Sequence, residues 1–215
     1  MRIDSLVIDS TKAFTELCEL GMITQSDKSP YNKVRHRHPY TAVYSMLLAQ
    51  HKGRPIRFAE IGIAAGCSAQ LWSQYFTNPG THLHYFDIDE ALFAPCQAAL
   101  CDTRVTTTRM DVSLDGDVQK ALSEFSDSYD VILDDSSHIF EHQIRIIKES
   151  LPLLKPGGLL IIEDIYRNAS EKDYAKALAD VLEECSAAYF VVCDHAKRWS
   201  PDYDNDKLLI LVKGS

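Results

Sequence analysis

The chain has 215 residues, 46% hydrophobic and 25% charged, proportions that are ordinary for one soluble globular domain. Its net charge of −9 argues against general binding to nucleic acid or to anionic membranes, because both require clustered lysine and arginine. The N-terminus lacks the apolar core of a secretory signal, and the six cysteines are scattered, so we expect reduced thiols and a cytoplasmic protein.

Residues 1–52 are expected to form an N-terminal helical extension. Apolar residues at helical spacing predict one helix over 6–20 and a second over 40–50. The polar stretch between them, 24–39, contains two prolines and is interpreted as a loop. Its basic run at 33–38 fits either a solvated surface or part of a substrate mouth. The extension would cover an active site or form a subunit contact in a homo-oligomer.

Residues 53–215 are expected to form the main domain, because strand and helix patterns alternate along them. Strands are predicted at 57–61, 82–87, 104–110, 129–133 and 159–162, and helices at 68–76, 92–100, 118–125, 140–154 and 170–184. Alternation of this kind implies right-handed crossovers and a parallel sheet. Two late strands, 188–193 and 208–213, have no helix between them and predict an antiparallel pair. The fold class is therefore α/β: a Rossmann-like doubly wound sheet, mostly parallel, with a C-terminal antiparallel strand pair.

A glycine loop follows the first strand of this domain. Glu60, Gly62 and Gly66 belong to a strand–turn–helix segment in which glycine permits a tight turn and close approach of a ligand. Ala64 stands where a dinucleotide fingerprint has its second glycine, so a pyrophosphate fits this loop poorly.

Acidic residues at the ends of the next strands are candidates for holding a nucleoside. Asp87 can accept hydrogen bonds from both ribose hydroxyls, although Asp is also a common helix N-cap. Asp111 can accept from an adenine amino group, and Met110 can pack on the ring. Asp134 is added to these cofactor-side residues, with a turn-forming role as its alternative.

Two acidic clusters end neighbouring predicted strands. Asp134-Asp135-Ser136-Ser137-His138 follows the strand at 129–133, and Glu163-Asp164 follows the strand at 159–162. The carboxyl ends of parallel strands meet at one edge, where open α/β sheets bind ligands. The sequence therefore predicts that these side chains surround a common pocket.

The residue types at this edge suit a divalent metal beside a general base. Asp135 and Asp164 are the expected Mg²⁺ ligands, with Glu163 as a third carboxylate, since Mg²⁺ prefers hard oxygen ligands. His138 is the expected catalytic base, because neutral histidine accepts protons near pH 7. The alternatives are that the acids are a solvated strand end and that the serines cap the following helix.

These motifs carry a resemblance that covers residues 56–213. Glu60, Gly62, Gly66, Asp87, Asp111 and the late antiparallel pair resemble the class I S-adenosylmethionine-dependent methyltransferases. The D-D-S-S-H and E-D clusters are similar to the metal-dependent sugar O-methyltransferases of the macrocin and mycinamicin type. Upstream, Ser26-Asp27-Lys28 followed by His38, Tyr40 and Tyr44 also resembles a stretch of those relatives. The resemblance implies S-adenosylmethionine as cofactor, Mg²⁺ at the acidic edge, and methylation of a hydroxyl on a small molecule or sugar.

Two other functions stay open at the level of the sequence. One is an NAD-type Rossmann oxidoreductase, against which the missing second glycine and the antiparallel pair both count. The other is a non-catalytic, methyltransferase-like binding module, which would transfer no methyl group.

Overall fold

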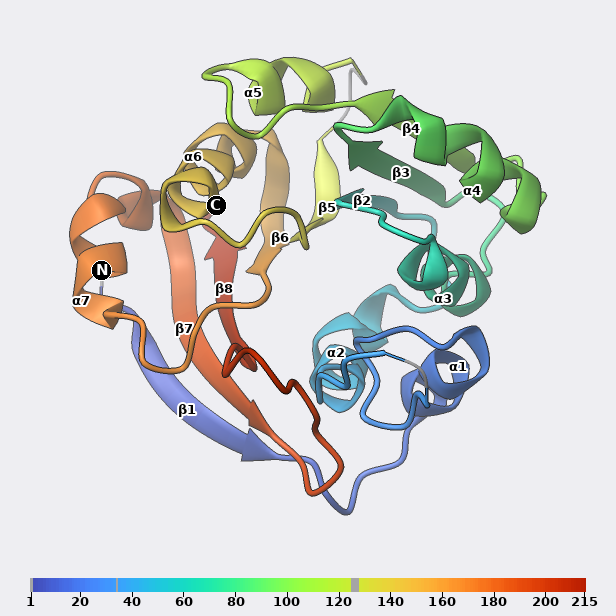
Figure 1. The fold of residues 1–215 in the computed structure, drawn as a ribbon. Coiled ribbons are helices and arrows are strands. Elements are labelled where there is room, and N and C mark those ends of the chain that lie inside the picture. The colour runs from blue at the N-terminus through green and yellow to red at the C-terminus, as the bar shows by residue number, and fades with distance from the viewer. Residues whose placement is uncertain (1, 34, 125–127) are drawn as a thin grey trace.

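The computed structural model describes residues 2–33, 35–124 and 128–215, and these form a single sheet with helices on both faces (Figure 1). The strands are β1 (Asp4–Asp9), β2 (Arg57–Ile61), β3 (His82–Asp87), β4 (Val105–Arg109), β5 (Tyr129–Asp134), β6 (Leu154–Ile162), β7 (Cys185–Asp194) and β8 (Lys207–Lys213). The helices are α1 (Glu16–Thr24), α2 (Thr41–Leu48), α3 (Cys67–Tyr75), α4 (Phe93–Leu100), α5 (Asp117–Leu122), α6 (Phe140–Ser150) and α7 (Glu171–Ala177). Val34 of the basic run and Phe125, the expected end of a helix, lie outside the described residues.

The strand order confirms the expected doubly wound sheet. Across the described residues the order is β1-β7-β8-β6-β5-β2-β3-β4. β8 is antiparallel to both β6 and β7, and the other pairs are parallel. Along the chain, β3 and β4 are added on one side of β2, and β5 then lies on its other side. The order therefore reverses between β2 and β5, and ligands bind at such a switch point.

Alternation along the central strands builds two hydrophobic layers. Val131 and Leu133 of β5 face the layer that contains α1, α2 and α3, whereas Ile132 faces the layer that contains α5, α6 and α7. Successive strand side chains point to opposite faces, so a strand covered on both sides has an unbroken apolar sequence. The apolar runs that predicted β5 and β6 have this cause.

The N-terminal segment corrects one expectation. The predicted helix over 6–20 is wrong in its first half, because Asp4–Asp9 form β1 and α1 begins only at Glu16. Leu6 and Ile8 fit a strand as well as a helix, since so short an apolar run does not separate the two periods. β1 pairs in parallel with β7, so this strand extends the sheet of the main domain. The boundary expected near residue 52 stays a prediction.

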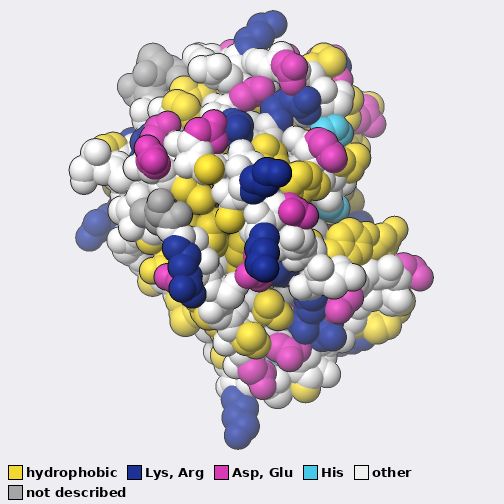
Figure 2. Space-filling model, turned by 90° about the vertical axis from the view of Figure 1, so that its left-hand side faces the viewer, with side chains coloured by type: hydrophobic (Ala, Val, Ile, Leu, Met, Phe, Trp, Pro, Cys, Tyr) yellow, Lys and Arg dark blue, Asp and Glu magenta, His cyan; other side chains and the backbone are white. Residues whose placement is uncertain are grey.

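The β1 edge exposes apolar side chains. Val7 and Leu6 are exposed, and from this side hydrophobic side chains lie among basic and acidic ones (Figure 2). All six cysteines are free. Among the described residues there is no helix with the length and apolar composition that a membrane span requires.

Candidate active site at the carboxyl edge of the sheet

Strand register brings the glycine loop and both acidic clusters to one place. Ile61 of β2 lies opposite Asp134 of β5, which in turn lies opposite Ile162 of β6. The ladder continues one residue further, because the Asp135 amide donates to the Ile61 carbonyl at 2.8 Å and the Glu163 amide donates to the Asp134 carbonyl at 2.9 Å. The predicted convergence of the two clusters is therefore confirmed.

Gly62 makes this close approach possible. Its φ is +93°, and a Cβ built on it would lie 2.2 Å from the carbonyl oxygen of Asp135. Only glycine combines that conformation with so close a backbone contact. At Gly62 the glycine loop and the first acidic loop therefore touch through main-chain atoms.

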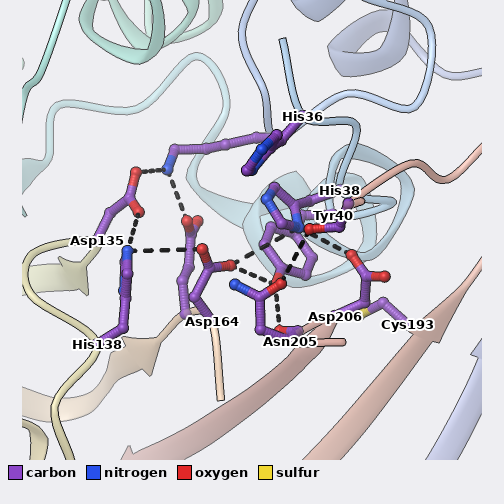
Figure 3. A network of polar contacts seen from close by, with 12 residues as sticks. His36, His38, Tyr40, Asp135, His138, Asp164, Cys193, Asn205 and Asp206 are labelled. Carbon is purple, nitrogen blue, oxygen red and sulfur yellow. Dashed lines mark hydrogen bonds and ion pairs between the residues drawn. The ribbon is translucent and has the colours of Figure 1, made fainter. Parts of the chain in front are cut away.

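Asp135, His138 and Asp164 form a compact group of possible metal ligands (Figure 3). One donor atom from each lies within 4.8 Å of the others. His138 Nε2 is 4.0 Å from Asp135 Oδ1 and 3.6 Å from Asp164 Oδ2. Two hard carboxylate oxygens at this separation fit the ligand preference of Mg²⁺, and the partial exposure of the group leaves room for water or substrate oxygens.

Two of these three residues have left-handed backbone conformations. His138 and Asp164 both have φ of +57°, which is uncommon for residues with a side chain. Such strain, of order 1–3 kcal/mol at each residue, gathers at functional sites where the surrounding structure imposes it. In both loops the turn directs the side chain back toward the shared edge.

Lys28 is the principal residue of the site that sequence reasoning missed. Its ammonium lies 2.5 Å from Asp135 Oδ2, 2.7 Å from Glu163 Oε2 and 3.5 Å from Glu60 Oε1. Only 1% of its side chain is exposed. The sole signal was the Ser26-Asp27-Lys28 resemblance, because nothing in one polar loop reveals that a lysine will be buried among distant acids.

The charges around Lys28 compensate one another. Burial lowers the pKa of Lys28, but Asp135, Glu163 and Glu60 outweigh burial and hold this pKa well above its ordinary value, so the side chain is a cation. Burial raises the pKa of Glu60 to about 7 despite the opposing effect of Lys28. Burial and Lys28 therefore act in opposite directions on the pKa of Glu60, and Lys28 offsets part of the cost of burying its charge.

Three further side chains of the N-terminal segment hold the acidic edge. The Tyr40 hydroxyl donates to Asp164 Oδ1 at 2.7 Å, and the Tyr44 hydroxyl donates to Glu163 Oε1. His38 Nδ1 lies 2.8 Å from Asp206 Oδ1 (Figure 3). Burial lowers the pKa of His38, but Asp164 and the hydrogen bond with Asp206 outweigh burial and raise it to about 9. The segment that was expected to cover the site thus contacts its carboxylates directly.

A cavity of about 440 Å³ opens beside this edge at the switch point. Four of the predicted cofactor residues line it: Gly62, Asp87, Met110 and Asp111. The Asp87 carboxylate also accepts from the backbone of the glycine loop, with Ile63 N at 3.0 Å from Oδ2. Asp87 therefore both shapes the loop and faces the cavity.

Three other predicted cofactor residues lie away from that cavity. Glu60 is buried and accepts from Ser68 Oγ at 3.0 Å and from Trp72 Nε1 at 3.2 Å, so it anchors α3 to β2. Gly66 lines a neighbouring hollow. Burial raises the pKa of Asp134 to about 6, against hydrogen bonds from Ser136. The roles expected for these residues at a cofactor stay predictions, and the geometry favours indirect roles.

A second cavity, of about 330 Å³, lies against His138. It is lined by His138, Phe140, Gln143, Ile165, Tyr166, Ala169, Ser170, Asp173 and Tyr174. Tyr166 also contacts Tyr203 in the late loop, with ring centroids 6.3 Å apart. His138 thus faces a cavity that leads to an exposed aromatic surface.

Comparison with known families identifies the central part of the chain. Residues 59–165 match a family model described as a methyltransferase domain. This chain carries a methyltransferase domain. The matched residues run from β2 through both acidic loops, whereas Lys28 precedes them.

Curated relatives share this region. The chain is 30% identical over 135 residues to 8-demethyl-8-alpha-L-rhamnosyl tetracenomycin-C 2'-O-methyltransferase of Streptomyces olivaceus, and 28% identical over 136 residues to demethylmacrocin O-methyltransferase of Streptomyces fradiae. Each alignment covers 60% of this chain. The aligned part covers about a third of each relative, 33% and 32% respectively. The resemblance to macrocin-type methyltransferases is confirmed.

Solved structures confirm the fold. The MycE methyltransferase from the mycinamycin biosynthetic pathway, solved with Mg and SAH, superposes with a TM-score of 0.67 at 20% identity, covering 94% of this chain and 55% of that chain. The O-methyltransferase TomG of Streptomyces achromogenes, solved with SAM, gives a TM-score of 0.61 at 14% identity and covers 92% of that chain and 95% of this one.

Proposed function

We propose that this protein is an S-adenosylmethionine-dependent O-methyltransferase, assisted by Mg²⁺, that acts on a hydroxyl of a small molecule or sugar. One observation carries the proposal. Asp135, His138 and Asp164 form one group, and Asp135 also lines the cavity that Asp87 and Met110 line. A methyl-accepting hydroxyl placed at that group would face both a base and the cofactor cavity.

The cavity residues suit a nucleoside cofactor. Each Asp87 oxygen accepts one backbone amide, from Ile63 or Asp89, and keeps a second lone pair for a ribose hydroxyl. Met110 offers an apolar surface for an adenine ring. Asp111 lines the same wall and can accept from an exocyclic amino group. When bound, the cofactor supplies an electrophilic methyl group and a divalent ion lowers the pKa of the acceptor hydroxyl.

His138 is proposed to take the proton of that hydroxyl at Nε2. This nitrogen faces Asp135 Oδ1 and Asp164 Oδ2, at 4.0 and 3.6 Å, so it is directed at the place where the acceptor hydroxyl would be held. A third of the side chain is exposed, at 33%, so an acceptor can reach it. The fixed loops supply alignment, which is the main contribution of a protein to such a transfer.

The second cavity is the proposed acceptor site. It lies against His138 and is lined by aromatic rings together with Ser170 and Asp173, a combination that binds the apolar faces and the hydroxyls of a sugar. The relatives' names specify methylation of sugar hydroxyls, which supports a glycoside as the acceptor class. A homo-oligomer and a cytoplasmic location stay predictions.

Transfer of a labelled methyl group tests this function. The protein is incubated with labelled S-adenosylmethionine and a panel of rhamnosides and other deoxysugar glycosides, with Mg²⁺ or with EDTA. We expect transfer to at least one glycoside that EDTA suppresses and Mg²⁺ restores. Transfer that EDTA does not change would remove the metal from the mechanism.

Calorimetry separates the alternatives. S-adenosylhomocysteine should bind, and NAD should not, because Ala64 with its Cβ stands where a dinucleotide loop has glycine. Binding of NAD instead would support an oxidoreductase. Binding of S-adenosylhomocysteine without transfer to any hydroxylated acceptor would support a binding module.

A further inference from the structure

The loop between α1 and α2 holds Lys28 in a fixed place. The Lys28 carbonyl accepts from the amides of Tyr40 and Thr41, each at 3.1 Å, and the Asp27 carbonyl accepts from His38 N at 2.7 Å. The backbone on both sides of the lysine is therefore tied to the start of α2. The side chain points inward to the carboxyl edge of the sheet, where it is fully covered.

The carboxylates are divided between two uses. Both oxygens of Glu163 are engaged within the protein, Oε2 by Lys28 and Oε1 by the Tyr44 hydroxyl. The two oxygens of Asp135 have different partners. Oδ2 accepts from the Lys28 ammonium, whereas Oδ1 faces His138. Asp164 keeps Oδ2 directed at His138 while Oδ1 accepts from Tyr40.

We propose that Lys28 is a built-in cation that limits how the acidic edge binds divalent metal. It takes Glu163 and the inner oxygen of Asp135 as its counter-ions, and it leaves the outer oxygens of Asp135 and Asp164, with His138 beside them, for one ion. Lys28 thus sets the affinity of the metal site without being a ligand. This inference rests on the proposed function only for the claim that this edge binds a divalent ion.

Removing the ammonium tests the proposal. Lys28→Met frees Oδ2 of Asp135 and Oε2 of Glu163, and it removes a like charge from the neighbourhood of the ion. Metal affinity rises with the number of charged ligands, so we expect the dissociation constant for Mn²⁺, measured by calorimetry at pH 7.5, to fall at least tenfold. The melting temperature of the variant should drop in EDTA and recover with Mg²⁺, because a buried acid cluster without a cation is unstable.

Lys207→Met is the matched control. Lys207 is also buried, at 2% exposure, and its ammonium lies 2.6 Å from Glu171 Oε1. Among the described residues the Lys207 ammonium contacts Glu171 and the Phe190 ring and none of the three possible ligands. Its loss should therefore lower the melting temperature without changing Mn²⁺ affinity and without recovery in Mg²⁺. Recovery of both variants by Mg²⁺ would mean that the metal stabilises the fold in general and would overturn the proposal.

Glu163→Gln provides a second test that keeps Lys28 in place. Asp135 and Glu60 still compensate the ammonium, so the variant should fold. If Glu163 is a counter-ion of Lys28 and not a metal ligand, the Mn²⁺ affinity of this variant should stay within about threefold of that of the wild type. A loss of tenfold or more would show that Glu163 is a metal ligand, as the sequence alone predicted, and would contradict the proposal.

The outcomes separate this inference from the proposed function. Binding of Mn²⁺ by the wild type, with no tighter binding by Lys28→Met, refutes the role of Lys28 and leaves metal assistance intact. Binding by Lys28→Met alone supports the role of Lys28 and removes the metal from the wild-type reaction. Absence of binding in both proteins refutes both claims.

Discussion

His138 occupies the position that decides the chemistry of the site. Its Nε2 lies between two carboxylates, and its Nδ1 is buried without a hydrogen-bond partner among the described residues. The ring can therefore act as a base through Nε2 or serve as a third metal ligand through the same atom. We favour the base, because Asp135 and Asp164 already offer the oxygen ligands that Mg²⁺ prefers.

His138→Ala separates these two roles. As the base, its loss should lower the methyl-transfer rate by about 10²–10⁴ while Mn²⁺ affinity changes little. His142→Ala removes a neighbouring ring that is hydrogen-bonded to Ser137 Oγ at 2.8 Å. This variant should lower the methyl-transfer rate by at most about tenfold. Loss of Mn²⁺ binding in His138→Ala would make the ring a ligand, and unchanged turnover would remove it from the mechanism.

Single residues also show where sequence reasoning stops. Asp135, His138 and Asp164 were predicted to meet because each follows an apolar strand, and strand ends of a parallel sheet coincide. Lys28 lies in a loop, and its burial depends on contacts with Asp135 and Glu163, 107 and 135 residues away. Local patterns carry no information about such contacts, so the division of the acids between lysine and metal could not be foreseen.

At the scale of elements, the loops after β2 and β5 act as one unit. Gly62→Ala places a Cβ 2.2 Å from the Asp135 carbonyl oxygen and must displace one of the two loops. We expect a loss of about 1–3 kcal/mol in the free energy of unfolding, as for other overpacked sites, and at least a tenfold loss of affinity for S-adenosylhomocysteine.

Gly53→Ala is the control for that prediction. Gly53 has a similar positive φ of +76°, but open space surrounds its added Cβ. The free energy of unfolding of Gly53→Ala should therefore fall only by the cost of the left-handed conformation, of order 1–2 kcal/mol. Its affinity for S-adenosylhomocysteine should not change. Equal cofactor affinity in the two variants would show that contact between the loops does not shape the cavity.

The segment after β6 should govern the acceptor rather than the chemical step. Tyr166 is 43% exposed and lines the second cavity, so Tyr166→Ala should raise the KM for the glycoside about tenfold and leave kcat within about twofold. Tyr189→Ala is the matched control, because Tyr189 is 37% exposed in the middle of β7. This variant should change neither KM nor kcat. A fall in kcat at unchanged KM would place Tyr166 in the reaction instead.

Elements differ in how well the sequence predicted them. β5 was predicted closely, and so was the second half of β6, because strands covered on both faces have unbroken apolar sequences. β6 begins earlier than predicted, at Leu154, which was wrongly expected to end a helix. β1 was mistaken for part of a helix, since it is an edge strand with most of its residues exposed. α7 ends at Ala177 although the spacing predicted a helix to 184, and a short 3₁₀ helix, Val181–Glu184, follows it.

For the whole molecule, acid stability depends on a buried histidine remote from the site. Burial lowers the pKa of His84 to about 3, so the folded protein binds fewer protons than the unfolded chain between pH 6.5 and 3. The free energy of unfolding should therefore fall as pH falls through this window, by at most about 1.4 kcal/mol per pH unit from this group. Above pH 6.5 the neutral His84 side chain no longer lowers the free energy of unfolding.

Urea unfolding at several pH values checks this dependence. His84→Gln should show a shallower fall between pH 6.5 and 4 than the wild type. His82→Gln, at an exposed position on the same strand, should match the wild type. A slope unchanged in His84→Gln would show that other groups control the acid stability of the protein.

The central claim is that the acidic edge and the cofactor cavity form one site. Paramagnetic relaxation by Mn²⁺ of the ¹³C-labelled methyl group of bound S-adenosylmethionine tests this most directly, because the effect falls steeply with distance. We expect strong broadening of the methyl signal in the wild type and its loss in Asp164→Asn, whose left-handed position asparagine tolerates. A methyl signal that stays sharp while Mn²⁺ and cofactor are both bound would contradict the account.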